Sequence, residues 1–332
     1  MRPLLDAAAR DEDEHLARNG PLPRLASGAL IGALQEAGLT GRGGANFPTW
    51  RKLARTAVTD RPVVIANAAE GEPASRKDKM LLQHCPHLVL DGLQLTAEAV
   101  GASRVYLYGA DVPQRKSDRY PITCVAAPNT FTAGESSAVM AAVSGRKPLP
   151  TDESRDDMLV QNVETLARIA QIARYGPRWF RQHDTFLATV SGAVQRPGVY
   201  EVEKPVTVQR LLDLAGGVET KAVLVGGYHG RWLTPRDVID DPGAGVAIAL
   251  SADESGLART TEIVNYLASQ STRQCGPCRF GLPALAEALA ARRMDQVYRL
   301  VGLVDGRGAC HHPDGTARLV RSALTAFAGE YR

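Results

Sequence analysis

Hydrophobic positions in the first half of the chain alternate between short apolar runs and helical repeats. Residues 61–66 and 105–108 are typical of β-strands, and a helical period over 79–100, broken near Pro86, separates them. Small residues favour a further helix over 136–143, and the stretch 163–175 repeats its apolar positions with a helical period. This succession of strands and helices predicts an α/β layer architecture.

The pattern changes near Asp184. Short strands are predicted at 186–191, 199–202, 223–225 and 232–233, and a turn signal separates the first two. Between the second and third strands, Thr207 is a suitable N-cap for a short helix that Gly216 ends. We therefore predict a small α+β domain here.

From Gly256 to Arg332 the apolar pattern is helical throughout, with stripes over 263–267, 282–289 and 319–327. These stripes predict a helical bundle. The chain thus divides into three predicted domains, 1–183, 184–255 and 256–332.

Composition narrows the class of protein. The 332 residues include 39 basic and 36 acidic side chains, a net charge of +3, and aromatic residues make up only 5%. Such an even balance of positive and negative charge argues against a nucleic-acid partner. The longest apolar runs, such as 63–66, are far too short for membrane insertion, and residues 1–16 carry acids where a secretory signal has an apolar run. We expect a cytoplasmic protein.

Five cysteines are present, an odd and small number. In a reducing compartment a close pair more often indicates metal or redox chemistry than a disulfide framework. Cys275 and Cys278 form such a pair, and Cys310 follows at a distance. Cys85 and Cys124 have no comparable neighbour, and we expect them to be core residues.

A glycine-rich segment, Gly41-Arg42-Gly43-Gly44, is the first candidate for ligand binding. Glycines let the main chain approach a ligand, and successive N–H groups can hold an anion. Arg42 and Lys52 add positive charge suited to a phosphate. The segment lacks the full spacing of the dinucleotide fingerprint, and a structural turn is the alternative.

Polar residues also follow the strand predicted at 61–66. Open α/β sheets bind ligands beyond the carboxyl ends of their strands, where Asn67, Glu70 and Glu72 are found. The two carboxylates are suited to hydrogen bonds from a ribose, an isoalloxazine ring or an amide, and a solvated loop is the alternative. Glu135 and Asn162 precede predicted helices, where ordinary capping explains them equally well.

Taken in order, these segments resemble the flavoprotein subunit of respiratory complex I, which binds FMN and NADH. The similar stretches are GRGGANFPT, NAAEGEPASRKDK, FTAGESS and QNVET, then TVSGAVQRPGVYEV and finally CGPCRFG with GRGACHHPDG. The resemblance extends from about residue 38 to residue 332. It implies a Rossmann-like α/β FMN-binding domain, a β-grasp (ubiquitin-like) domain that binds soluble ligands, and an all-α helical bundle with an iron–sulfur site.

The resemblance also implies a cofactor site. The FMN phosphate and ribityl chain would be held by Gly41, Arg42, Gly43, Gly44 and Lys52. The flavin would lie along Asn67, Glu70, Phe131, Gly134, Glu135, Asn162 and Thr165. Glu72 corresponds to a glutamate at the nicotinamide site of the family. Bound FMN performs the hydride transfer from NADH, so no side chain is implied as a catalytic residue.

For the metal site, the resemblance aligns Cys275, Cys278 and Cys310 with three of the four cysteines that hold a [4Fe-4S] cluster. Thr272 stands in place of the first cysteine of that set. This implies a [4Fe-4S] cluster with one iron bound differently, or a [3Fe-4S] cluster, with a nitrogen from His311 or His312 as a possible ligand. Zinc held by three cysteines and one histidine is the rival interpretation.

The chain departs from the family pattern in ways that affect NADH more than FMN. Ala69 and Ser136 replace a family aspartate and glutamate, and the stretches 109–129 and 147–159 are shorter than in the family. We expect a complex I-like electron-transfer flavoprotein, with NAD(H) or a ferredoxin as donor or acceptor. We also expect it to form a hetero-oligomer with other electron-transfer subunits. A non-catalytic scaffold or ligand-binding descendant without flavin is the alternative.

Overall fold

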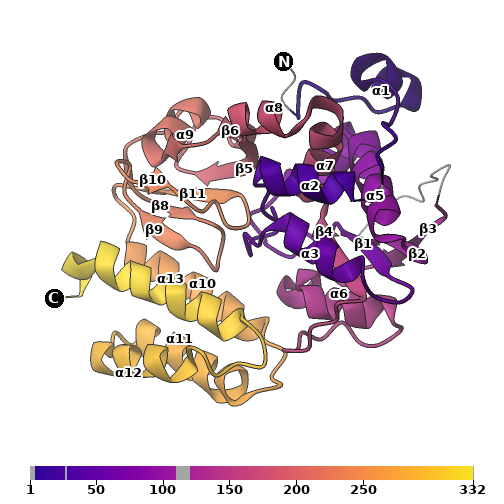
Figure 1. Cartoon of the computed structure of the whole chain (residues 1–332). Helices are drawn as coiled ribbons and strands as arrows, with labels where there is room; N and C mark the ends of the chain where they lie inside the picture. The colour runs from indigo at the N-terminus through magenta and orange to yellow at the C-terminus, as the bar shows by residue number, and fades with distance from the viewer. Residues whose placement is uncertain (1–3, 27, 110–119, 332) are drawn as a thin grey trace.

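A computed structural model describes residues 4–26, 28–109 and 120–331. In Figure 1 the first sheet and its helices lie on the right, the second sheet lies on the upper left, and the C-terminal helices lie below the second sheet. Residues 110–119, within the shortened stretch 109–129, are outside the described residues.

The first sheet is four-stranded and entirely parallel, in the order β3-β2-β1-β4. Its strands are β1 (Val63–Asn67), β2 (Arg104–Gly109), β3 (Ile122–Ala126) and β4 (Met158–Asn162). Asn67 pairs with Asn162 at the carboxyl ends of β1 and β4, so these two chain segments leave the sheet side by side. The parallel sheet confirms the predicted α/β architecture.

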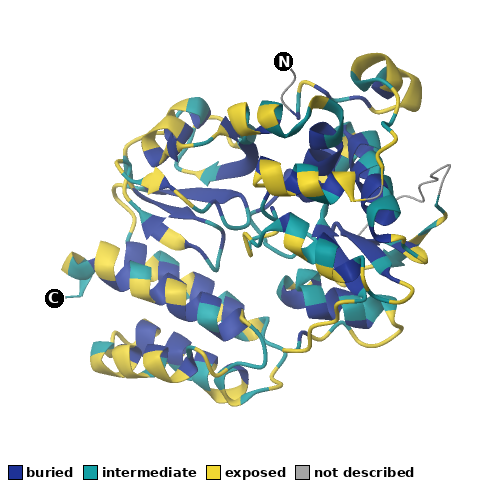
Figure 2. Ribbon diagram, in the orientation of Figure 1, coloured by how far each residue is buried: buried dark blue, intermediate teal, exposed yellow. Residues whose placement is uncertain are grey.

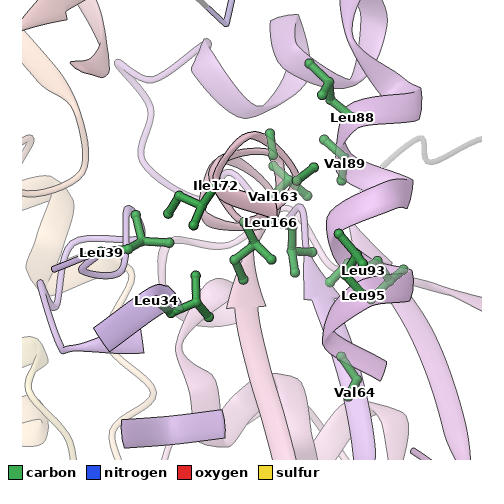
Figure 3. Packing of buried hydrophobic residues seen from close by; sticks show 14 of the residues in the cluster. Leu34, Leu39, Val64, Leu88, Val89, Leu93, Leu95, Val163, Leu166 and Ile172 are labelled. Atoms are coloured by element: carbon green, nitrogen blue, oxygen red, sulfur yellow. The ribbon is translucent and has the colours of Figure 1, made fainter. Parts of the chain in front are cut away.

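Helices cover both faces of this sheet because successive strand residues point to opposite sides. Val64 on β1 packs with α5 (Pro86–Val100) and α7 (Val163–Tyr175), as Figure 3 shows. These two helices touch closely, since a Cβ on Gly92 would lie 1.8 Å from the Leu166 carbonyl oxygen. On the other face, Ile65 belongs to a cluster with Val139 of α6 (Ser136–Val143).

The remaining elements of this region are short and pack around the sheet and its two long helices. They are α1 (Glu12–Asn19), α2 (Ala29–Ala37), α3 (Thr49–Thr56), α4 (Lys77–His84), the 3₁₀ turn η1 (Phe131–Gly134) and α8 (Pro177–Gln182).

The second sheet is five-stranded and mixed, in the order β6-β5-β11-β8-β9. Its strands are β5 (Thr185–Gly192), β6 (Gly198–Glu203), β8 (Thr220–Val225), β9 (Arg231–Leu233) and β11 (Val246–Ser251). Only β5 and β11 pair in parallel. A small ladder joins β7 (Val206–Thr207) to β10 (Val238–Ile239), and α9 (Val208–Ala215) begins at the predicted N-cap Thr207, whose side chain accepts from Arg210 N.

The C-terminal region is helical and packs on the second sheet. It contains α10 (Gly256–Ser269), a π-helical turn η2 (Pro277–Gly281), α11 (Leu282–Ala290), α12 (Met294–Val304), α13 (His312–Ala326) and the 3₁₀ turn η3 (Ala328–Glu330). Trp232 of β9 enters this core and donates its indole N–H to Thr260 Oγ1 at 2.9 Å. Figure 2 shows buried and exposed positions alternating around α12 and α13, as amphipathic helices require.

Most of the predicted elements form near their expected positions, including helices 136–143 and 163–175. Sequence reasoning missed strands β3, β4, β7, β10 and β11 and helices α1, α2, α3, α8 and α12. Strand β11 is the central strand of its sheet and reads as an apolar run without alternation because both of its faces are covered, whereas β4 is an edge strand of the parallel sheet. Cys85 is buried as expected, and Cys124 is half-buried against the same core.

Candidate functional site

The predicted flavin residues gather where the strand order of the parallel sheet reverses, between β1 and β4. Such a switch point opens a crevice at the carboxyl ends of the strands. Asn67 ends β1 and donates its side-chain amide to the Gly134 carbonyl at 2.8 Å. Asn162 ends β4 and caps α7 by accepting from Glu164 N at 3.0 Å. The sheet therefore brings together segments that are about a hundred residues apart in sequence.

The glycine-rich loop lies against the amino end of α7. The backbone N–H of Arg42 donates to Thr165 Oγ1 at 2.9 Å, and a Cβ on Gly43 would lie 3.3 Å from Asn162 Cβ. Gly44 has a φ of +104°, which favours glycine. The loop backbone thus borders a helix N-terminus, the usual place for an anion such as phosphate.

Arg42 itself is directed elsewhere. Its side chain is buried, and its guanidinium pairs with Asp184, just before β5. The charge that the sequence suggested for a phosphate is therefore already compensated within the chain. Of the two cations predicted to bind a phosphate, Lys52 is therefore the one that remains available.

Lys52 lines a cavity of about 550 Å³ together with Glu135 and Cys310. Burial lowers the pKa of Lys52, and Glu135 partly opposes this effect. Across the described ranges, no carboxylate forms an ion pair with the Lys52 ammonium group. A largely desolvated ammonium without a close counterion is suited to an anionic ligand, so the residues present fit the phosphate of FMN.

The carboxylates of Glu70 and Glu72 have different surroundings although they are two residues apart. Glu70 caps α4, accepting from the backbone N–H of Asp78 at 3.0 Å and of Lys79 at 3.2 Å. Glu72 turns toward the second sheet and accepts from Tyr228 N at 2.8 Å. Burial raises the pKa of Glu72 to about 7, and that backbone bond only partly opposes the shift.

Sequence reasoning gave no role to Lys77 and Asp78, yet both are buried and enclose Asn162. Asn162 Oδ1 accepts from Lys77 Nζ at 3.2 Å, while Asn162 Nδ2 donates to Asp78 Oδ2 at 2.7 Å. Burial raises the pKa of Asp78 to about 6 although Lys77 opposes this shift. The network fixes the Asn162 amide beside the glycine-rich loop. The only sequence signal was the Lys-Asp pair that closes the similar segment NAAEGEPASRKDK.

Two further predicted residues, Phe131 and Glu135, lie at the two ends of η1. Glu135 caps α6, accepting from Ser137 N at 2.9 Å and Ala138 N at 3.2 Å. The Phe131 ring lies edge-on to His229 with centroids 4.7 Å apart, and 5.6 Å from the ring of His312. Phe131 therefore sits where all three regions of the chain meet.

The three predicted metal-binding cysteines are neighbours in space. Burial raises the pKa of Cys278 to about 12, with contributions from the thiols of Cys275 and Cys310. A bound cation would compensate thiolates placed this close together, so the donor set fits an iron–sulfur cluster in kind. Thr272 is nearby in sequence and accepts from Gln274 Nε2 at 3.0 Å.

The candidate nitrogen ligands are oriented differently from each other. His311 is exposed and its Nδ1 lies 3.3 Å from Asp314, whereas His312 is buried with Nε2 2.9 Å from the Leu267 carbonyl. Within residues 4–26, 28–109 and 120–331, no three His, Cys, Asp or Glu side chains form a group suited to holding a metal ion, so the three cysteines match a cluster in donor type but are not brought together as a ligand set. In the same ranges, no helix combines the length and apolar character needed to cross a membrane.

Comparison with known sequence families assigns each region to a class. The Nuo51 FMN-binding domain matches residues 34–171, the SLBB domain matches 187–227, and the NADH-ubiquinone oxidoreductase-F iron-sulfur binding region matches 258–332. These matches, in this order, define a flavin- and iron–sulfur-binding oxidoreductase subunit. Along most of its length the chain is similar to F subunits of NADH-quinone oxidoreductase.

Individual relatives agree with this assignment. The NADH-quinone oxidoreductase F subunit of Escherichia coli (strain K12) is 26% identical over 398 residues, covering 96% of this chain and 88% of the relative. The corresponding protein of Streptomyces coelicolor is 28% identical, covering 91% of this chain and 82% of the relative. Among solved structures, an NAD+-reducing [NiFe]-hydrogenase in the H2-reduced state has a TM-score of 0.84 at 26% identity. The match covers 91% of this chain but only 62% of the hydrogenase chain.

Proposed function

We propose that this chain is an electron-transfer flavoprotein subunit of an NADH dehydrogenase-like oxidoreductase. It binds FMN and passes electrons between NAD(H) or a ferredoxin, the flavin and an iron–sulfur cluster. The observation that carries the proposal is the β1–β4 switch point, where Asn67 pairs with Asn162 and the glycine-rich loop meets Asn162. Lys52 lines a cavity together with Glu135.

FMN, when bound, supplies the chemistry of accepting a hydride and releasing electrons singly. The chain supplies binding and orientation. Lys52 and the backbone of residues 41–44 would hold the phosphate, while Lys77 and Asp78 keep Asn162 fixed beside that loop. The other predicted flavin contacts follow the strand and helix ends, at Asn67, Glu70, Phe131, Gly134, Glu135 and Thr165.

For the cluster, we propose Cys275, Cys278 and Cys310 as ligands of a [4Fe-4S] or [3Fe-4S] centre, with Thr272 where the family has its fourth cysteine. The match of residues 258–332 to an iron–sulfur binding region supports this interpretation over zinc.

The same proposal includes the domain type of the second sheet and of the C-terminal helices. The second sheet with α9 corresponds to a β-grasp domain, the helices from α10 onward to a bundle, and the boundaries lie near 183 and 255. The proposal also includes a hetero-oligomer with other electron-transfer subunits, because the similar proteins are subunits of larger enzymes, and a cytoplasmic location.

Anaerobic reconstitution tests the proposal. The protein is mixed with FMN, iron and sulfide, desalted and analysed for flavin, iron and zinc, and its flavin absorption is then followed in a stopped-flow instrument after addition of NADH. We expect stoichiometric flavin that NADH bleaches, and iron in excess of zinc. Protein that retains no flavin would support the scaffold alternative, which the oxidoreductase relatives do not favour.

A further inference from the structure

The loop between β10 and β11, residues 241–245, lies against the glycine-rich loop, residues 41–44. A Cβ added to Gly44 would lie 3.8 Å from both the amide nitrogen of Ala244 and the carbonyl carbon of Gly243, which is an ordinary van der Waals distance. Both loops also line a crevice of only about 10 Å³, which has room for one water molecule at most. The backbone that would hold the FMN phosphate is therefore packed directly against the region of the second sheet.

The backbone of loop 241–245 is itself closely packed, and two of its glycines make this possible. Gly243 has a φ of +53°, which favours glycine, and a Cβ there would lie 2.7 Å from Gly226 Cα. Gly245 has a φ of +67°, and a Cβ there would lie 3.0 Å from Lys77 Cδ. Loop 241–245 therefore contacts both the glycine-rich loop and Lys77, the lysine that helps to fix the side-chain amide at the end of β4.

A buried ion pair joins the same two parts of the chain. The backbone N–H of Arg42 donates to Thr165 Oγ1 at 2.9 Å, while its buried guanidinium pairs with Asp184, the residue directly before β5. The other carboxylate oxygen of Asp184 lies 4.0 Å from Lys204 Nζ, so this carboxylate faces two cations. Separating Arg42 from Asp184 would leave a buried guanidinium without its carboxylate, which is strongly unfavourable. The pair therefore anchors the glycine-rich loop to the second sheet.

We propose that Asp184 and loop 241–245 are positioning elements of the flavin site, which hold the glycine-rich loop in the conformation that receives the FMN phosphate. This inference rests on the proposed function, because it takes FMN as the ligand of residues 41–44. Arg42 then serves the phosphate through its backbone, and its side chain keeps that backbone in place. A loop that is ordered beforehand loses less conformational entropy when it binds a ligand, so the anchor raises the affinity of the site.

Titration of the full chain with FMN and, separately, with riboflavin tests the positioning role, because riboflavin lacks the phosphate. Quenching of flavin fluorescence gives both dissociation constants for the wild type, Asp184→Asn, Arg42→Gln and the double variant. The double variant removes both charges of the buried pair, so it provides the same test should a single variant not fold. Glu201→Gln is the matched control, because the Glu201 carboxylate joins the second sheet to the buried Arg168 at 2.9 Å.

We expect Asp184→Asn and Arg42→Gln each to raise the dissociation constant of FMN about tenfold, because part of the binding energy must then order the loop. The double variant should weaken FMN binding no more than either single variant, since the two side chains act as one unit. The dissociation constant of riboflavin should stay within about twofold of the wild-type value in all three variants. Glu201→Gln should bind both flavins as the wild type does.

Three outcomes would overturn the positioning role while leaving FMN binding intact. Unchanged FMN affinity in the double variant would remove Asp184 from the site. Tighter FMN binding by Asp184→Asn would show that Asp184 withholds the Arg42 guanidinium from the phosphate. Equal weakening of FMN and riboflavin would show a general loss of structure rather than an effect on the phosphate. A wild-type chain that binds neither flavin would reject the proposed function itself, and the positioning role with it.

Discussion

Replacing Glu72 by glutamine should change how the stability of the protein depends on pH. Burial raises the pKa of this carboxyl from 4.5 to about 7 in the folded chain. In the unfolded chain the group ionises near its ordinary pKa. Between these two pH values, the unfolded state has released a proton that the folded state still holds, so rising pH favours unfolding.

The magnitude follows from the size of this shift. Each pKa unit corresponds to about 1.4 kcal/mol, so the Glu72 carboxyl removes about 3 kcal/mol of unfolding free energy between pH 4.5 and pH 7. The contribution of Glu72 to the unfolding free energy is complete below pH 4.5 and is lost as the pH rises through about 7. Glutamine is neutral throughout and keeps a carbonyl oxygen that can accept from Tyr228 N.

Urea unfolding at pH 5 and pH 8 provides the assay. From pH 5 to pH 8, the unfolding free energy of the wild type should fall by about 2 to 3 kcal/mol more than that of Glu72→Gln. Glu219→Gln, which changes an exposed glutamate, controls for the loss of one negative charge. Parallel changes in wild type and Glu72→Gln would show that the carboxyl is not desolvated by its contact with the second sheet, and the reasoning would fail.

Three further predictions concern other buried groups. Lys52→Met should raise the dissociation constant of FMN at least tenfold in a fluorescence titration, because a charge-assisted bond contributes about 1.5–3 kcal/mol; unchanged affinity would remove Lys52 from the phosphate site. Glu201→Gln should lower the unfolding free energy by about 3 kcal/mol in urea, since Arg168 would lose its nearest carboxylate, at 2.9 Å, and remain buried with Glu164 3.7 Å away; a change below about 1 kcal/mol would contradict this. Cys278→Ser should lower the iron content after reconstitution while Cys85→Ser leaves it unchanged, and equal iron in both variants would exclude the proposed ligand set.

Local sequence patterns were sufficient to predict those elements whose apolar periodicity and caps are set within a few residues. Helix α7 and the cap at Thr207 formed where they were predicted, because an amphipathic period and a side-chain cap are set by neighbouring positions. The predicted site segments also lie together at one end of the parallel sheet. That arrangement was predictable because parallel strands in an open α/β sheet share one carboxyl edge.

Other features depend on partners that are distant in sequence. Arg42 pairs with a residue 142 positions away, and Glu72 accepts from one 156 positions away. No local signal distinguishes an arginine that faces a phosphate from one whose charge is neutralised in this way. The enclosure of Asn162 by Lys77 and Asp78 is of the same kind.

The sequence by itself determined the class of protein, the order of its three regions and the residue types available for FMN and for a cluster, because these are carried by motifs that are continuous along the chain. Only the tertiary structure decided which of those residues retain a free charge. Burial and long-range pairing neutralise Arg42 and raise the pKa of Glu72, but leave Lys52 beside the cavity without a close counterion among the described residues. The physical reason is that desolvation and ion pairing depend on what surrounds a side chain in space, which the order of residues does not specify.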